Sequence, residues 1–226
     1  MFVVKCRIES TEVFASLPNP GRLLELLLPN ADVYLEKNSS KTRRFQYTLV
    51  AVNRNNKPIL LHTHKTNDVA EYLLRNNLIP ELKGTQIIKR EATLGNSRFD
   101  FLLRLDDKNT YLEVKSCTLF RDNVAMFPDA VTLRGKKHIT ELAKLYSSKD
   151  KQGAVLFIVH TDDVDIFLPE YHIDPKFTLA LLNVKDKIKV IAAAVTYDNS
   201  LSLNHKVKTL NIPWTIVERI KIKNRR

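Results

Sequence analysis

The chain has few of the residues that build disulfide-bonded or zinc-stabilised folds. Its 226 residues include two cysteines and five glycines. Cys6 and Cys117 are too few and too far apart for a disulfide framework or a zinc site, so we expect both to be small buried residues in a reducing compartment. With so few glycines there is no glycine-rich phosphate loop, which argues against a nucleoside triphosphate site.

Long apolar runs are also absent. The longest, at residues 154–159 and 190–195, are far shorter than the roughly 20 residues that span a bilayer. The first residues show no signal-peptide pattern. The sequence therefore predicts a soluble, cytoplasmic protein without a membrane partner.

The histidines form no catalytic or metal-binding set. His62 and His64 share one face of a predicted strand, but no third ligand is spaced nearby, and we expect both to face solvent. His160, His172 and His205 stand alone. No Ser/His/Asp or Cys/His arrangement follows from them.

Positive charge is what the chain has in excess. Lys and Arg number 36 against 25 Asp and Glu, a formal net charge of +11, while 44% hydrophobic and 27% charged residues are ordinary for a globular chain. The surplus favours a polyanionic partner, most often nucleic acid, although a basic surface or an affinity for anionic membranes gives the same composition.

The first 66 residues have the texture of a small β-domain. Strand patterns occupy residues 2–8, 33–36, 45–52 and 59–63, with a turn signal at 18–22 and one helical turn at 23–28. Several short strands in so few residues fit a small barrel, for which an oligonucleotide-binding (OB) barrel is one candidate. We place the domain boundary at residue 66.

Residues 67–226 alternate between strands and helices. Asn67 is expected to cap a helix, and another helix carries Ile139, Leu142, Ala143 and Tyr146 on one face. Strands are expected at 86–94, 98–105, 110–116, 154–159 and 188–195, a helix at 175–184, and an edge strand at 213–223. The order predicts an α/β domain (α+β for the whole chain) with a mostly parallel sheet wrapped by helices.

Residues 98–116 form a predicted hairpin whose register follows from its apolar faces. The apolar residues of the first strand lie at odd positions, and Leu112 and Val114 of the second lie at even positions. For these apolar residues to share one face, the numbers of two residues that pair across the hairpin must sum to an odd value. A turn over residues 106–109 makes that sum about 215. Asp100 would face Lys115 and lie diagonal to Glu113, so two carboxylates and a lysine share one face.

This trio has a chemical use. Two neighbouring carboxylates suit a hard divalent cation, and a lysine beside them can orient a water and stabilise charge developing on a phosphodiester. The alternative is a surface ion-pair lattice, which is common across neighbouring strands.

Asp100 followed by Glu113-Val114-Lys115 resembles the pattern of the PD-(D/E)xK nuclease superfamily. Four segments narrow the resemblance to the sugar fermentation stimulation protein family (SfsA): residues 18–22 (PNPGR), 97–102 (SRFDFL), 113–116 (EVKS) and 127–138 (FPDAVTLRGKKH). The resemblance implies an N-terminal OB-like barrel, a nuclease-type mixed sheet flanked by helices, and DNA binding. It also implies that Asp100 and Glu113 ligate Mg²⁺ or Mn²⁺ and that Lys115 serves the attacking water. A non-catalytic DNA-binding regulator of the same family is the alternative.

Three further carboxylates are candidates for the site. Superfamily sites are often completed by an acidic residue on the preceding helix, where Glu71 is the candidate, with Glu91 on the next strand as its rival. A plain solvated glutamate explains Glu71 better, because its helical position lies off the Val69/Leu73 stripe. Asp129 lies in the family-like segment, and an aspartate before a helix is also an ordinary cap or turn residue.

Basic residues mark where nucleic acid would bind. Phosphate at the start of a helix would offset the cost of placing cations there and would use its free N–H groups, although simple solvation explains these cations too. A basic loop with interleaved aromatic residues suits a nucleic acid strand, although a solvated charged loop beside buried aromatics explains it too. At the helix start the predicted contacts are Arg134, Lys136 and Lys137, which lie beside His138. On the first domain they are Lys41, Arg43 and Arg44, which lie beside Phe45 and Tyr47. Arg22, directly after the turn, is a further predicted contact.

Overall fold

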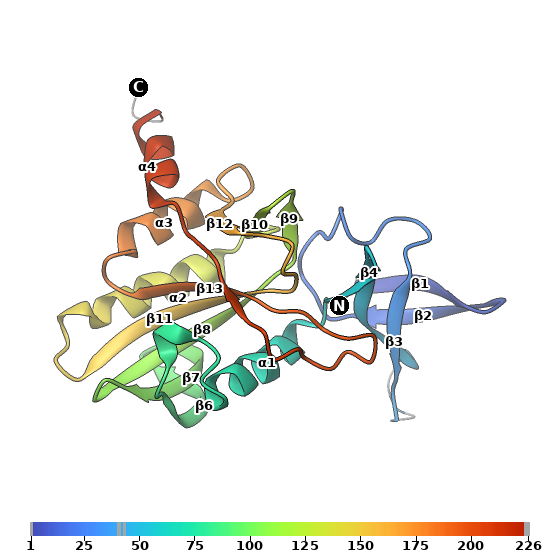
Figure 1. Ribbon diagram of the computed structural model, residues 1–226, viewed down its shortest axis with the longest axis horizontal. Helices are drawn as coiled ribbons and strands as arrows, with labels where there is room; N and C mark the ends of the chain where they lie inside the picture. Colours follow the sequence, from blue (N-terminus) through green and yellow to red (C-terminus); the bar gives the residue numbers. More distant parts are fainter. Residues whose placement is uncertain (1, 40–41, 43, 224–226) are drawn as a thin grey trace.

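The computed structural model describes residues 2–39, 42 and 44–223 and has two parts (Figure 1). A small domain of strands lies on one side, and a larger domain of sheets and helices lies on the other. None of the helices in these described residues combines the length and apolar character needed to cross a bilayer.

The N-terminal part is a five-stranded sheet in the order β1-β2-β4-β3, with β5 paired to β4. Its strands are β1 (Phe2–Ile8), β2 (Thr11–Leu17), β3 (Val33–Lys37), β4 (Tyr47–Arg54) and β5 (Lys57–Leu60). The predicted β-rich character is confirmed. The pairings between described residues form an open path rather than a closed ring. Strand β2 was not predicted, although Val13, Ala15 and Leu17 alternate along it and form its more buried face.

The larger part is built on a six-stranded sheet in the order β14-β13-β11-β8-β7-β6. Its strands are β6 (Gln86–Leu94), β7 (Ser97–Leu105), β8 (Lys108–Cys117), β11 (Lys151–Val159), β13 (Lys189–Ala194) and β14 (Lys208–Thr209). Only β8, β11 and β13 run parallel, and the other pairs are antiparallel. The mixed sheet that the family resemblance implies is therefore confirmed, whereas the mostly parallel sheet predicted from the order of elements is wrong, since the β6-β7-β8 meander fills one side of it.

A second, three-stranded sheet and four helices complete the fold. The small sheet has the order β12-β10-β9. The remaining elements are β9 (Leu119–Arg121), β10 (Val124–Phe127), β12 (Ile166–Pro169), α1 (Thr63–Arg75), α2 (Leu133–Ala143), α3 (Pro175–Val184), α4 (Trp214–Lys223) and the 3₁₀ turns Pro80–Leu82 and Lys144–Ser147. Tyr146 falls in the second of these turns and is exposed, so the predicted helical face ends before it.

The continuous apolar run of β11 is explained by burial on both faces. Leu156 and Ile158 pack with the α1 side of the sheet, whereas Val155 and Phe157 pack with α2 and α3. The second of these cores continues into the N-terminal sheet through residues such as Leu49. The two parts of the chain therefore share one hydrophobic core.

The β7–β8 hairpin turns on two residues instead of four. Asp106 and Asp107 both have positive φ, 50° and 59°, as a two-residue type I′ turn requires. Leu105 pairs with Lys108, so opposing numbers sum to 105 + 108 = 213. The predicted odd sum is confirmed, but the predicted value of 215 is wrong, because Lys108 and Asn109 belong to β8 and not to the turn.

The last segment is the helix α4 and not the predicted edge strand. Its sequence alternates, but Trp214 and Val217 also have the i, i+3 spacing of a helix face. Val217 is buried and Ile216 is 47% exposed, so packing selects the helical spacing. Alternation over a short window could not separate the two periods.

Helix α1 begins at Thr63, four residues earlier than the cap predicted at Asn67. The residue before it, His62, makes no side-chain cap hydrogen bond. Instead the backbone N–H and the hydroxyl of Thr63 both donate to the carbonyl of Pro18, at 3.3 and 2.8 Å. A tertiary contact with the N-terminal domain therefore starts the helix, and Asn67 lies inside it.

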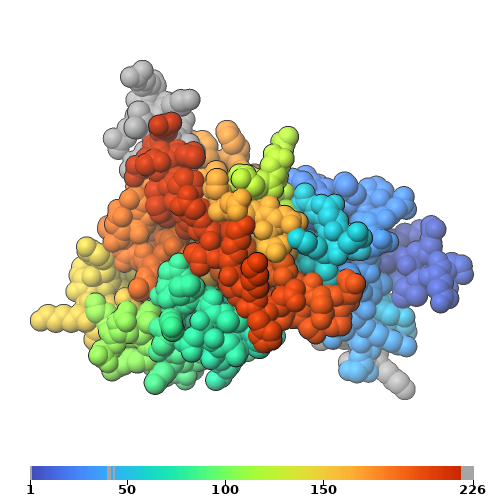
Figure 2. All heavy atoms as spheres, in the orientation of Figure 1, coloured from blue at the N-terminus to red at the C-terminus, as the bar shows by residue number. Residues whose placement is uncertain are grey.

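Ion pairs also tie the two parts together. Lys57 Nζ lies 2.8 Å from Asp162 Oδ1 and 2.6 Å from Asp163 Oδ1. Figure 2 shows the cyan surface of this region of the N-terminal part against orange atoms of the larger part. The exposed pairs add little free energy by themselves, but they show that the β4–β5 hairpin rests on the larger domain.

Candidate functional site

Asp100 stands where the β7–β8 ladder ends. The last backbone pair is Phe101 with Leu112, and continuing that register by one pair sets Asp100 opposite Glu113. Beyond this pair, a side chain replaces the backbone acceptor: the Val114 N–H donates to Asp100 Oδ2 at 2.7 Å. Its Oδ1 accepts the Asn67 amide at 2.8 Å. Burial, and then the charge of Glu113, raise the pKa of the Asp100 carboxyl.

Glu113 is 4% exposed and receives two donors on one oxygen. Lys115 Nζ lies 2.5 Å and His138 Nδ1 2.7 Å from Glu113 Oε1. Burial by itself raises the pKa of this carboxyl, but the His138 hydrogen bond and the Lys115 ammonium outweigh burial and lower it. Asp100, Glu113 and Lys115 thus share one face, as predicted, with Asp100 facing Glu113 rather than Lys115.

These three side chains line a pocket of about 480 Å³. Its walls come from the N-terminal domain at residues 19–21, from the start of α1 at residues 63–67, and from residues 126–135. Glu91 and Arg98 stand at its β6–β7 side, and Asp129 and Arg134 at the side of α2. The fold therefore brings together Asp100, Glu113, Lys115, Asp129 and Arg134 from the predicted set.

Asp129 connects the two domains at the edge of this pocket. Its Oδ2 accepts the backbone N–H of Leu23 at 2.8 Å. Burial is the main cause that raises the pKa of the Asp129 carboxyl. A Cβ atom on Gly21 would lie 2.8 Å from the same oxygen, so the turn can approach Asp129 only without a side chain there. The sequence allowed a turn role for Asp129 within its own segment, whereas the observed partner is 106 residues away.

The start of α2 faces the same pocket. Thr132 caps the helix by accepting the Gly135 N–H at 3.0 Å, and the first turn holds no acidic residue. Arg134 is exposed and lines the pocket, while Lys136 and Lys137 are exposed on the next turn. The predicted cluster of cations at a helix start is confirmed as a placement.

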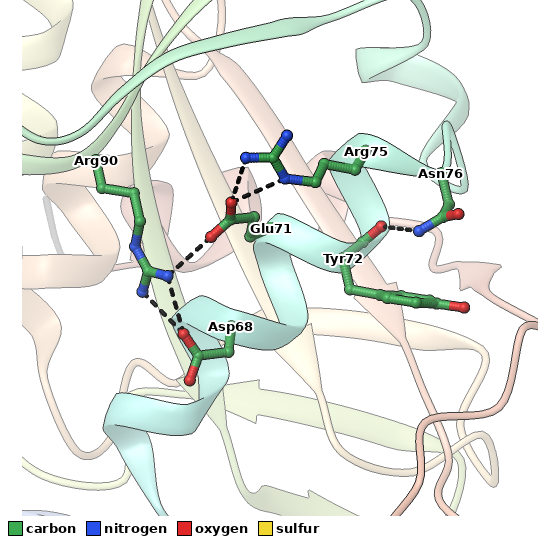
Figure 3. Close-up of polar contacts among 6 residues, drawn as sticks. All are labelled: Asp68, Glu71, Tyr72, Arg75, Asn76 and Arg90. Carbon is green, nitrogen blue, oxygen red and sulfur yellow. Dashed lines mark hydrogen bonds and ion pairs between the residues drawn. The ribbon is translucent and has the colours of Figure 1, made fainter.

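Glu71 does not line the pocket. Its carboxylate is held between two arginines on the outer side of α1 (Figure 3). Arg75 lies 2.6 Å from Oε1 and Arg90 lies 2.8 Å from Oε2, and Arg90 also pairs with Asp68 at 2.9 Å. Among the α1 residues that line the pocket, Asn67, one turn earlier, donates to Asp100.

The other predicted basic contacts lie on the N-terminal domain. Arg22 is exposed directly after the turn at Gly21. Arg44 is exposed and lies over the Phe45 ring, 5.3 Å from its centroid. Lys41 and Arg43 lie outside the described residues.

His138 is a site residue that sequence reasoning counted only among the basic residues of the helix start. Its Nε2 lies 3.4 Å from Arg134 Nε, a donor, so Nε2 accepts and Nδ1–H donates to Glu113. The ring packs on Phe99 with centroids 5.3 Å apart. No local signal could identify this role, because 25 residues separate His138 from Glu113.

A buried polar network adjoins the pocket on the other face of β8. Ser116, which lines the pocket, contacts His160 Nε2 at 3.1 Å, and His160 Nδ1 contacts the Tyr197 hydroxyl at 2.7 Å. Burial lowers the pKa of His160 to about 3. The sequence indicated that His160 stands alone. In the structure it is instead a neutral ring that joins β8 to the segment after β13.

The donor set suits a hard divalent cation. Within the described ranges, both polar contacts of Glu113 fall on Oε1, which leaves Oε2 for a cation. The same ranges hold no cluster of three or more His, Cys, Asp or Glu arranged around a metal position. Cations of the Mg²⁺ type bind proteins through one or two carboxylates and take their other ligands from water and substrate. The pair Asp100 and Glu113 fits that mode.

Comparison with known proteins agrees with this architecture. The SfsA N-terminal OB domain matches residues 2–61, and the sugar fermentation stimulation protein RE domain matches residues 64–200. A sugar fermentation stimulation protein homolog of Methanothermobacter thermautotrophicus is 34% identical over 94% of this chain and 89% of its own. The homolog of Clostridium kluyveri is 39% identical over 84% of each chain.

A solved structure has the same fold. The structure of Pyrococcus furiosus SfsA in complex with Ca²⁺ superimposes with a TM-score of 0.85 at 29% identity, over 93% of this chain and 90% of that one. The N-terminal sheet is therefore an OB domain, and the chain belongs to the sugar fermentation stimulation protein (SfsA) family.

Proposed function

We propose that this chain is a divalent-metal-dependent nuclease that acts on DNA. The observation that carries the proposal is the convergence of Asp100, Glu113 and Lys115 in the lining of one pocket. Asp100 and Glu113 Oε2 would hold Mg²⁺ or Mn²⁺. When bound, such a cation lowers the pKa of a ligated water and neutralises charge developing on the phosphodiester. The Ca²⁺ in the related P. furiosus structure supports binding of a divalent cation.

The chain's own residues supply positioning and charge. Lys115, with a side chain 14% exposed, presents its ammonium beside Glu113 and would donate to the attacking water or to a non-bridging phosphate oxygen. Asn67 and the Val114 N–H hold both oxygens of Asp100, which fixes the direction of that carboxylate. His138 does the same for Glu113.

The basic residues around the pocket would hold the substrate backbone. Arg134 lines the pocket at the N-terminal end of α2, where free N–H groups and the helix dipole favour a phosphate. Lys136 and Lys137 on the same helix would extend this contact. Arg22 and Arg44 of the OB domain would meet the strand outside the pocket. Lys41 and Arg43, which lie outside the described residues, are proposed as contacts from their place in the basic sequence around Arg44.

The test is cleavage of labelled DNA. Purified protein is incubated with single- and double-stranded oligonucleotides in Mg²⁺, Mn²⁺ or EDTA, beside the Asp100→Ala variant. We expect turnover in a metal buffer, none in EDTA, and a loss of about 100-fold or more in the variant. DNA binding without turnover on any substrate would contradict the nuclease and support the non-catalytic DNA-binding regulator.

A further inference from the structure

A buried histidine links two elements that line the pocket. His160, directly after β11, is 0% exposed and does not itself belong to the pocket lining. Its Nε2 lies 3.1 Å from the Ser116 hydroxyl of β8 and 3.4 Å from the Thr66 hydroxyl of α1. Ser116 and Thr66 both line the pocket. One ring nitrogen therefore bridges α1 and β8 next to the candidate site.

The Asp100 carboxylate bridges the same two elements. Its Oδ1 accepts the Asn67 amide of α1, and its Oδ2 accepts the Val114 N–H of β8. Asn67 directly follows Thr66, and Val114 lies two residues before Ser116. Both contacts of the carboxylate form together only when α1 and β8 keep one spacing. The histidine bridge lies within two residues of each contact, so it is placed to set that spacing.

The first turn of α1 docks through a polar group. The buried residues of this helix are Ala70, Leu73 and Leu74, which join the apolar core, and Thr66, which is 2% exposed. Within the residues that the structure describes, His160 is the only hydrogen-bond partner of the Thr66 hydroxyl. A buried hydroxyl without a partner is unfavourable, so loss of Nε2 favours movement of this turn away from β8.

The end of β8 also depends on contacts other than β7. The β7–β8 ladder stops at the pair of Phe101 with Leu112, and beyond it residues 113–117 pair with β11. Ser116 lies in this last stretch, and among the described residues its hydroxyl has His160 as its only hydrogen-bond partner. The ring therefore holds α1 and β8 where the regular backbone pairing with β7 has ended.

The two nitrogens of the ring face different parts of the fold. Nε2 contacts the two hydroxyls beside the pocket, whereas Nδ1 contacts the Tyr197 hydroxyl at 2.7 Å. A neutral imidazole has one donor and one acceptor nitrogen, and a hydroxyl can serve either one. Substitutions that keep one nitrogen position and lose the other can therefore separate the two contacts.

We infer that His160 is a positioning residue for Asp100. It holds the first turn of α1 at the distance from β8 at which one carboxylate takes both the Asn67 amide and the Val114 N–H. The inference rests on the proposed function, because the carboxylate fixed in this way is the one that would ligate the cation. The imidazole itself touches neither the cation nor the substrate.

Two substitutions of His160 test the role of Nε2. His160→Asn keeps a polar group near Nδ1 and has none near Nε2, whereas the longer side chain of His160→Gln reaches the position of Nε2. In calorimetric titration with Mn²⁺ we expect an affinity about fivefold lower for His160→Asn and within about twofold of the unmodified protein for His160→Gln. Unchanged affinity in His160→Asn, or the same loss in both variants, would overturn the inference.

Tyr197→Phe is the matched control for a general loss of stability. It also removes one buried hydrogen bond of the His160 ring, at Nδ1, and leaves the contacts of Nε2 in place. We expect a lower melting temperature in EDTA but an unchanged affinity for Mn²⁺. A loss of affinity as large as that of His160→Asn would assign the effect to destabilisation and contradict the positioning role.

A second variant removes the partner of the ring instead of the ring. Thr66→Val keeps the shape of the side chain without its hydroxyl, and it decides the question if His160→Asn does not fold. We expect the same loss of about fivefold in Mn²⁺ affinity. In an Asn67→Ala background the loss should shrink to less than about twofold, because the contact that it protects is already gone. Additive losses would contradict action through Asn67.

Hydrogen exchange of the Val114 N–H in EDTA follows Asp100 without metal. We expect exchange about fivefold faster in His160→Asn and Thr66→Val, since the acceptor of this N–H is less well held. Faster exchange in a protein that binds no Mn²⁺ would remove the proposed function and leave the inference standing. Mn²⁺ binding with unchanged exchange and affinity in both variants would support the metal site and overturn the inference.

Discussion

The Nδ1 atom of His138 lies 2.7 Å from Glu113 Oε1, and both side chains are buried. Together with Lys115 on the same oxygen, the imidazole sets which oxygen of Glu113 faces the pocket. A partner of this kind orients a metal-binding carboxylate without touching the metal itself.

Replacing His138 should weaken metal binding more than it weakens the fold. His138→Phe keeps a ring against Phe99 but loses the donor, and we expect affinity for Mn²⁺ to fall about 10- to 100-fold. His138→Asn retains an N–H near Nδ1 and should recover part of that loss. Calorimetric titration with Mn²⁺ measures both, with thermal melting in EDTA as the control for folding. Unchanged Mn²⁺ affinity in His138→Phe would refute the role.

The two carboxylates should have opposite effects on stability in the absence of metal. The pKa of Asp100 is raised in the folded state, so its ionised form is unfavourable there and stability is lost as pH rises through that pKa. Asp100→Asn removes this cost, and its amide can pair with Asn67 after an amide flip. We expect a melting temperature in EDTA equal to or above that of the unmodified protein.

Glu113→Gln should be destabilising under the same conditions. The pKa of Glu113 is lowered, so its contribution is present above the unfolded pKa and is lost as pH falls through the folded one. Removing the charge leaves His138 and Lys115 with a weaker acceptor, which should cost about 1–3 kcal/mol. Melting curves of both variants at neutral pH in EDTA decide the matter. A shift in the same direction for Asp100→Asn and Glu113→Gln would contradict these environments.

His160 should make the fold sensitive to mild acid. Its pKa is about 3 in the folded protein against an ordinary value of 6.5. Between these values the unfolded chain binds a proton that the folded chain does not, so stability is complete above pH 6.5 and falls with decreasing pH by up to about 1.4 kcal/mol per unit. Urea unfolding from pH 7 to 4 measures this slope.

His160→Gln should flatten that pH dependence, because the titrating group is gone. The matched control is His205→Gln, since His205 also contacts a tyrosine hydroxyl, that of Tyr72 at 2.8 Å, but is exposed. The control should keep the slope of the unmodified protein. If His160→Gln keeps the steep slope, other titrating groups cause the pH dependence of stability.

Arg134 should contribute one phosphate contact to DNA binding. Arg134→Gln is expected to reduce the slope of log K against log salt for a single strand by about 0.7, the value for one phosphate. Lys149→Gln removes an exposed cation that does not line the pocket and is the matched control, with no change expected. Anisotropy titrations at several salt concentrations give the slopes. Equal slopes for the two variants would remove Arg134 from the DNA contacts.

Glu71 should be dispensable for cleavage. It pairs with Arg75 and Arg90 outside the pocket, so Glu71→Gln should change the cleavage rate by less than about twofold and stability by about 0.5–1 kcal/mol. Rate assays beside the Asp100→Ala variant provide the comparison. A loss as large as that of Asp100→Ala would place Glu71 in the site.

Local patterns were enough to predict much of the fold. The helix Pro175–Val184 has the predicted bounds, because Asp174 caps it through Oδ1 and Pro175 opens it. The apolar run at residues 154–159 predicted a strand buried on both faces, as β11 is. The odd sum of the hairpin register followed from its apolar faces. In each case the sequence signal lies within one element or between neighbouring elements of the chain.

The sequence by itself determined that Asp100, Glu113 and Lys115 share one face of a hairpin, because the two-residue period of a strand leaves no other arrangement once the apolar face is buried. Only the tertiary structure decided what surrounds them. Asn67 reaches Asp100 across 33 positions, His138 reaches Glu113 across 25, and Asp129 holds Leu23 across 106. Such contacts depend on how sheet, helices and the OB domain pack, and the spacing of residues along the chain carries no record of that packing.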